Sequence, residues 1–215
     1  MKGLFIKDML SFRKINKITG SIGTVALLVF LLLMKSDIGF YIANFIILPL
    51  NAATQASLLS YHDEQWKWKH YMIAAPTTAK DIVASRMLAS YLIFAIKSIS
   101  VELFNVAFLL THRDFSRELF MFIVISAIIL TAISVSIFII GDFVNNNNRK
   151  LASLLQILLI LLGAVLIYAI SKAPASILEA MLTVSKPMIL FVIGVVFIVI
   201  TIFTYLVSIS MVRKR

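Results

Sequence analysis

The sequence predicts an all-α, polytopic membrane protein with six transmembrane helices. The 215-residue chain is 61% hydrophobic and only 14% charged, and its mean hydropathy is +1.01, whereas soluble domains carry far more charge on their surface. The apolar residues form six continuous runs, each close to the roughly 20 residues that an α-helix needs to cross a hydrocarbon core. Because these runs do not alternate with polar residues, they favour helices over membrane-spanning strands.

A short leading segment precedes the transmembrane domain, which comprises residues 18–215. The predicted spans are residues 18–34, 38–60, 87–110, 119–140, 151–170 and 188–211. We expect the leading segment, residues 1–17, to be an interfacial amphipathic helix that lies in the headgroup plane and is attracted by anionic lipid. A plain positively charged flank is the alternative. One face of this helix carries Phe5, Met9 and Phe12, and the opposite face carries Lys7, Ser11 and Lys14.

The distribution of positive charge predicts that both termini are cytoplasmic, because cytoplasmic loops carry an excess of Lys and Arg close to the spans. With the N-terminus inside, 14 of the 20 Lys and Arg residues flank the spans on the cytoplasmic side, five flank them outside, and Lys97 lies within a span. We therefore expect a multi-pass protein of the plasma membrane. The net charge of +10 follows from this topology and does not indicate nucleic-acid binding. Residues 141–150, with four consecutive Asn, are interpreted as a solvated cytoplasmic loop.

The largest polar interruption, residues 61–86, lies on the cytoplasmic side and is predicted to be ordered. Residues 63–73 fit about three helical turns, and Pro76 breaks that helix. Thr78 is expected to cap a second helix together with Asp81, three residues later, and this helix continues into the third span. The segment is thus a rigid elbow below the membrane. An amphipathic surface anchor is the alternative.

The chain lacks the residues of the common catalytic sites. None of its seven glycines precedes a lysine, so the GxxxxGK[ST] phosphate loop of ATPases is missing. It has no Cys, which excludes disulfides and thiolate metal sites. Its three histidines lie outside the spans and have no spacing typical of a metal site, and neither GxSxG nor HExxH occurs. We therefore expect no enzymatic activity, no cofactor and no metal in this chain.

Polar side chains in the third span predict the lining of a transport path. Uncompensated polar groups are costly in hydrocarbon and therefore face protein or water. Lys97 and Glu102 are five residues apart and do not pair well on a straight helix. Ser98, Glu102 and Asn105 recur at helical spacing and form one polar stripe. A structural clamp between helices is an equally good interpretation of this stripe.

The second span carries a similar stripe of amides. Asn44, Asn51 and Gln55 fall on one face of a regular helix, and Pro49 lies between them. Proline removes a backbone hydrogen bond and usually kinks a helix. Such a helix suits the wall of a cavity or a moving element, and simple hydrogen bonding between helices is the alternative.

These features resemble the permease subunits of the second class of ATP-binding-cassette exporters. Such permeases have about six spans, both termini inside and a basic amphipathic helix before the first span. After the second span they carry an acidic residue, a short coupling helix, a turn with proline and two basic residues. Here that motif maps onto Glu64, the helix through Ile73, Ala75-Pro76-Thr77, Lys80 and Arg86. In place of the family's frequent glycine in the coupling region, this chain has Trp66–His70.

The resemblance implies a permease that depends on partners. Two copies of a separate P-loop ATPase subunit, which binds ATP and magnesium, would dock on two permease subunits, identical or different, embedded in membrane lipid. The implied ATPase-coupling residues are Glu64, Trp66, Lys67, Trp68, Lys69, Tyr71, Pro76 and Lys80. Within the family the chain is similar to Gram-positive permeases that export phenol-soluble modulins in staphylococci, which implies amphipathic toxin or antimicrobial peptides as substrates.

Two interpretations of the chain do not need this resemblance. One is a proton-coupled secondary transporter that uses Lys97 and Glu102. The other is a regulatory membrane protein that transports nothing. A P-loop ATPase bound to the chain would separate the exporter from both.

Overall fold

The computed structural model describes residues 2–15, 18–34, 36–65, 78–112, 115–144, 149–172 and 186–213. These residues are almost entirely helical and include no strand, which confirms the predicted all-α class. Each predicted span coincides with a helix, and α3, η1 and α4 together form the second one. The elements are α1 (Lys2–Ile15), α2 (Ile18–Leu33), α3 (Asp37–Ile42), the π-helical turn η1 (Ala43–Ile47), α4 (Leu48–Gln65), α6 (Ala79–Thr111), α7 (Arg117–Val144), α8 (Arg149–Lys172) and α10 (Lys186–Arg213).

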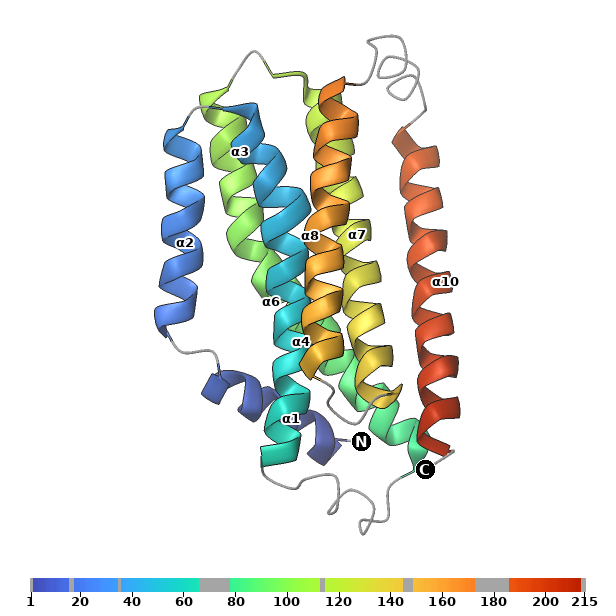
Figure 1. Cartoon of the computed structure of the whole chain (residues 1–215). Coiled ribbons are helices and arrows are strands. Elements are labelled where there is room, and N and C mark those ends of the chain that lie inside the picture. Colours follow the sequence, from blue (N-terminus) through green and yellow to red (C-terminus); the bar gives the residue numbers. More distant parts are fainter. Residues whose placement is uncertain are drawn as a thin grey trace.

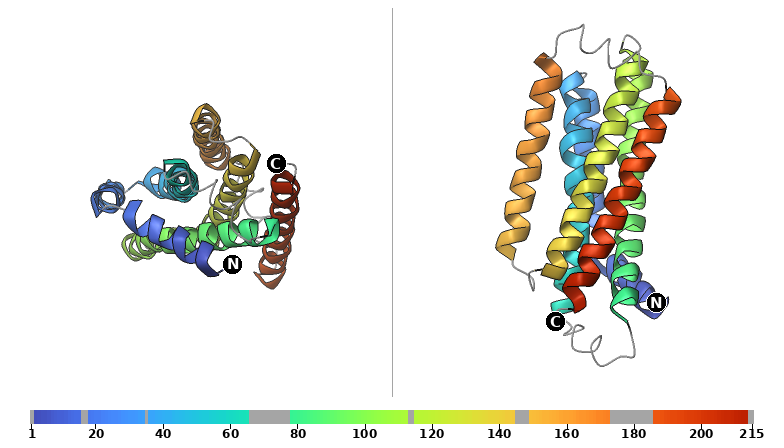
Figure 2. Two further views of the ribbon diagram at one scale, coloured as in Figure 1. Left: turned by 90° about the horizontal axis from the view of Figure 1, so that it is seen from below. Right: turned by 90° about the vertical axis from the view of Figure 1, so that its right-hand side faces the viewer.

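The long helices stand side by side in a bundle, and α1 lies across one end of it (Figure 1). Both chain termini lie at that end, which we call the termini end (Figure 1). Viewed along the bundle, α8 and α10 flank α7, and α1 crosses α6 (Figure 2). Helix α7 also packs closely against α4, so it occupies the middle of the bundle.

Four helices in the described part of the chain are long and apolar enough to cross a membrane: Asp37–Thr54, Ala79–Thr111, Arg117–Phe143 and Gly194–Val212. The apolar parts of α2 and α8 are shorter, Ile22–Leu33 and Gln156–Ile170. Large apolar side chains cover the outer surfaces of α2, α8 and α10, where Leu33 is 73% exposed and Phe203 61%. Surfaces of this kind suit lipid or another subunit. Six crossings and cytoplasmic termini stay predictions.

The predicted capping box at the start of α6 is confirmed. Asp81 N donates to Thr78 Oγ1 at 3.2 Å, and Thr78 N donates to the Asp81 carboxylate at 3.4 Å. Helix α6 then runs without interruption to Thr111, so the second arm of the elbow is joined rigidly to the third span, as predicted. The first arm is helical as far as Gln65, and its remainder and the Pro76 break lie outside the described residues.

The second span changes its helical pattern directly before Pro49. Leu48 N donates to the Ala43 carbonyl, five residues back, which is the π-helical spacing. Pro49 has no N–H to offer the Phe45 carbonyl four residues back. Gly163 of α8 lies against that carbonyl, since a Cβ on Gly163 would lie 2.6 Å from the oxygen. The glycine therefore lets α8 approach the π turn at backbone distance.

Buried hydroxyl groups let α7 pack tightly in the middle of the bundle. Thr131, Ser134 and Ser136 are at most 3% exposed, and each donates to the backbone carbonyl four residues back at 2.7 to 2.8 Å. Because their donors are satisfied within the helix, these small side chains lie against α7's neighbours at little polar cost. At the end opposite the termini, Phe40 stacks on Phe108 and Phe120, with ring centroids 4.6 and 5.2 Å apart.

Candidate functional site

A buried cluster of charged side chains joins four helices at the termini end. Arg86 of α6 lies at its centre. Its Nη1 is 3.3 Å from Asp8 Oδ1, its Nε is 3.6 Å from Asp142 Oδ2, and its Nη2 donates to Asp63. Lys7 Nζ lies 2.5 Å from Asp63 Oδ1 and 2.7 Å from Asp8 Oδ1. We call these five residues, from α1, α4, α6 and α7, the Arg86 cluster.

The cluster is shielded from water, and its charges depend on one another. Asp8 is 2% exposed, Asp63 4% and Arg86 7%. Buried ions are tolerated only with close, well-oriented partners, and a guanidinium offers five donors in a planar fork that stays protonated. Two cations face three carboxylates, so the loss of either cation would increase the excess of buried negative charge. The cluster therefore holds the four helices in one relative arrangement.

The position of the cluster matters because it brackets residues 66–77. Asp63 lies near the end of α4, just before that segment, and Arg86 lies in the third turn of α6, just after it. Their hydrogen bond ties the two flanks of the segment together. Asp8 and Asp142 extend the tie to α1 and α7. A displacement of the segment would consequently act on four helices at once.

Most of the predicted ATPase-coupling residues lie in or beside this bracketed segment. Lys80 is exposed in the first turn of α6. Glu64 follows Asp63 in the last turn of α4, and its side chain lies outside the described residues. The remaining predicted residues also lie outside them: Trp66, Lys67, Trp68, Lys69, Tyr71 and Pro76. Their role stays a prediction.

Three predicted path-lining residues form one hydrogen-bonded network between η1 and α6. Asn44 and Asn105 exchange hydrogen bonds of 2.8 and 3.1 Å, and Asn105 Nδ2 also donates to Glu102 Oε2 at 3.2 Å. Asn44 Nδ2 donates in addition to the Phe40 carbonyl at 3.0 Å. Both amides are buried, and all their N–H groups are used. The amides therefore act as a clamp in this conformation, whereas lining of a path stays a prediction.

The other predicted path-lining residues meet different partners. Asn51 Nδ2 lies 3.4 Å from Thr24 Oγ1 of α2, and Ser98 Oγ donates to the Ala95 carbonyl of its own helix at 2.9 Å. Lys97 Nζ lies 5.8 Å from the ring centroid of Phe12 in α1, so it and Glu102 contact different groups, as their spacing predicts. The side chain of Gln55 lies outside the described residues.

Sequence reasoning missed the carboxylates of the Arg86 cluster. The interpretation of residues 141–150 as a solvated loop is wrong for residues 141–144 and 149–150. Helix α7 continues to Val144 and places Asp142 against Arg86, and α8 begins at Arg149. A usable signal was present, since Asp8 and Asp142 are isolated acids in the basic segments on one predicted side of the membrane, and Asp63 lies in a third such segment beside Glu64. An isolated acid at a span end that faces a near-membrane arginine favours an ion pair.

Comparison with known proteins places this architecture in a family. A family model described as "ABC-2 family transporter protein" matches residues 3–213. The match therefore spans α1 to α10 and includes both the Arg86 cluster and the capped start of α6. Neither a curated protein nor a solved structure matches the chain. Because the family model covers nearly the whole sequence, the chain belongs to the ABC-2 family of transporter proteins.

Proposed function

We propose that this chain is the permease subunit of an ATP-binding-cassette exporter and that separate ATPase subunits drive it through residues 61–86. The family match over residues 3–213 carries the proposal. ABC-2 proteins are membrane components of ABC transporters, normally lack an ATPase site of their own and associate with ATPase subunits. The absence of a phosphate loop from this sequence agrees with ATP hydrolysis by a separate subunit.

The Arg86 cluster supports a mechanism for the coupling. When an ATPase subunit moves residues 66–77, it moves the end of α4 and the start of α6, which flank that segment. Shifting Asp63 or Arg86 alone would leave a buried charge without its partner, which is strongly unfavourable. The helices that share the cluster therefore move together rather than separately, and the motion reaches α1 and α7.

The amide network supports a proposal for the path. While the Arg86 cluster keeps α4 and α6 together at the termini end, a tilt of η1 away from α6 would separate Asn44 from Asn105 and expose polar groups at the level of the spans. Exposed amides and the Glu102 carboxylate would then line the path between two permease subunits, together with Asn51, Gln55, Lys97 and Ser98. We propose amphipathic peptides as the substrate class, on the basis of the resemblance described above.

Co-purification tests the partnership. We expect the chain to co-purify with a P-loop ATPase, and we expect replacement of residues 66–71 by Gly and Ser to abolish binding. A matched control replaces Asn145 to Asn148, which lie between α7 and α8 in the sequence. The proposal fails if no P-loop ATPase binds, or if the two replacements have equal effects.

Stimulation of ATP hydrolysis tests the substrate and the path. Amphipathic peptides should stimulate hydrolysis by the assembled complex in a bilayer, and non-amphipathic peptides of the same charge should not. Lys97→Met and Glu102→Gln should lower export while leaving assembly with the ATPase intact. If both variants export normally, these two residues are structural and the path lies elsewhere.

A further inference from the structure

The residues of helix α1 fall on three sides that differ in burial and polarity. Leu4, Asp8 and Phe12 lie one turn apart from each other, are at most 9% exposed and pack against the bundle. Gly3, Leu10 and Lys14 lie in line on a second side and are exposed, Leu10 by 60%. Ile6 lies on the third side and is 55% exposed, although it is large and apolar. An exposed apolar side on a helix with one side already buried needs its own explanation.

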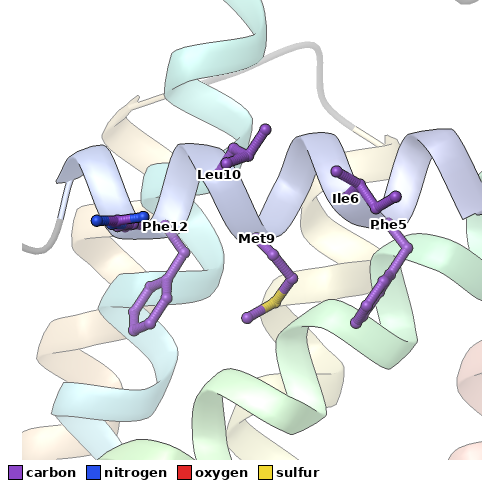
Figure 3. Close-up of a pocket in the computed structure, with 6 residues that line it drawn as sticks. Phe5, Ile6, Met9, Leu10 and Phe12 are labelled. Atoms are coloured by element: carbon purple, nitrogen blue, oxygen red, sulfur yellow. The ribbon is translucent and has the colours of Figure 1, made fainter.

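The third side borders an open cavity of about 440 Å³, a size typical of small-ligand sites. Figure 3 shows Phe5, Met9 and Phe12 projecting from one side of α1, with Ile6 and Leu10 projecting in another direction. These five side chains line the cavity, and all of them are apolar. Arg13 completes the lining and is its only charged member.

Arg13 interrupts an otherwise apolar surface. It follows Met9 by four residues and Ile6 by seven, so on a helix it lies in line with both. The acidic residue of α1, Asp8, lies on the buried side and is engaged with Lys7 and Arg86. A guanidinium beside hydrocarbon is costly unless it meets an anion, and arginine binds phosphate through two parallel hydrogen bonds.

We propose that this side of α1 is a binding site for one anionic phospholipid. The acyl chains lie against Phe5, Ile6 and Met9, and the phosphate binds Arg13. Lipid is the partner whose chemistry matches both halves of the site, because it joins a hydrocarbon chain to an anionic group over a short distance. The location agrees, since α1 lies across the end of a bundle whose outer helices are covered with exposed apolar side chains. The inference requires a bilayer but no ATPase partner.

Lipid binding can be measured on the full chain alone. Because the sequence has no Cys, Leu10→Cys provides a single labelling position at the edge of the cavity. The labelled chain is reconstituted in vesicles, and fluorescence quenching by brominated phosphatidylglycerol is compared with quenching by brominated phosphatidylcholine. One arginine near an anionic headgroup should favour phosphatidylglycerol about fivefold.

Matched variants in the labelled chain distinguish a site from general attraction to a charged surface. Arg13→Gln should reduce the preference to about one, and Arg13→Lys should keep most of it. Lys14→Gln removes the same charge from the neighbouring residue on another side of α1 and should leave the preference unchanged. Equal quenching by the two lipids in the parent chain would overturn the proposal, and so would equal losses in Arg13→Gln and Lys14→Gln.

Discussion

Replacing Arg86 with Met removes the cation at the centre of the Arg86 cluster and keeps a side chain of considerable length. The change leaves three carboxylates facing one another, with Lys7 as the remaining cation of the cluster. The side chain of Arg86 is 8% exposed, and those of Asp8 and Asp63 are 3% and 5% exposed. Water can therefore replace little of what is lost, and we expect a severe loss of stability.

The magnitude follows from the distances. With an effective dielectric constant of about 20, two unit charges 3.3 Å apart, as in Arg86 and Asp8, attract each other by about 5 kcal/mol. Desolvation of the ions offsets part of this attraction, and removing one partner of a buried pair typically costs about 3–5 kcal/mol. A loss of that size is a large share of the roughly 5–15 kcal/mol that holds a folded protein together.

The assay is reversible unfolding of the purified chain in detergent, monitored by tryptophan fluorescence. Lys80→Met is the matched control, because Lys80 lies on the same helix, is exposed and loses the same charge. Asp63→Asn added to Arg86→Met should restore part of the stability, since it removes one uncompensated carboxylate. A loss in Arg86→Met no larger than that in Lys80→Met, or a further loss on adding Asp63→Asn, would refute the reasoning.

Three other substitutions test separate parts of the structure. Gly163→Ala should lower the free energy of unfolding by about 1–3 kcal/mol, because the new Cβ would clash with the Phe45 carbonyl. The control Gly23→Ala should be neutral or slightly stabilising, because a Cβ there has nothing within 4 Å. Asn105→Ala should cost about 1–3 kcal/mol by orphaning buried Asn44, and the double alanine variant should cost less than the sum of the single variants. Thr78→Ala should cost about 1 kcal/mol and accelerate hydrogen exchange in the first turn of α6 alone.

The helices were predictable because hydropathy and helix caps are local signals. Hydropathy marks the apolar part of a helix rather than its full length, so the predicted third span, residues 87–110, is shorter than α6. The capping residues Thr78 and Asp81 supplied the missing start, since their spacing identifies the first turn without any tertiary contact.

The contacts of the site were not predictable, because they depend on how helices distant in sequence are rotated against one another. Arg86 meets Asp8 across 78 positions, and Asn44 meets Asn105 across 61. The prediction that Asn44 and Asn51 share one face of the second span assumes a regular helix. The π turn that contains Asn44 changes the rotation there, and the two amides contact different helices, α6 and α2.

The rotation of α1 about its own axis determines both which of its residues face the bundle and which face outward. A turn of the helix by one residue, about 100°, would replace Asp8 near Arg86 with Lys7, which repels the guanidinium, or with Met9, which cannot accept its hydrogen bonds. Only the observed rotation satisfies Arg86, and the same rotation turns Ile6 and Arg13 outward. The buried ion pair therefore determines which side of α1 is available to lipid. This explains how a helix that buries few apolar side chains keeps a single orientation.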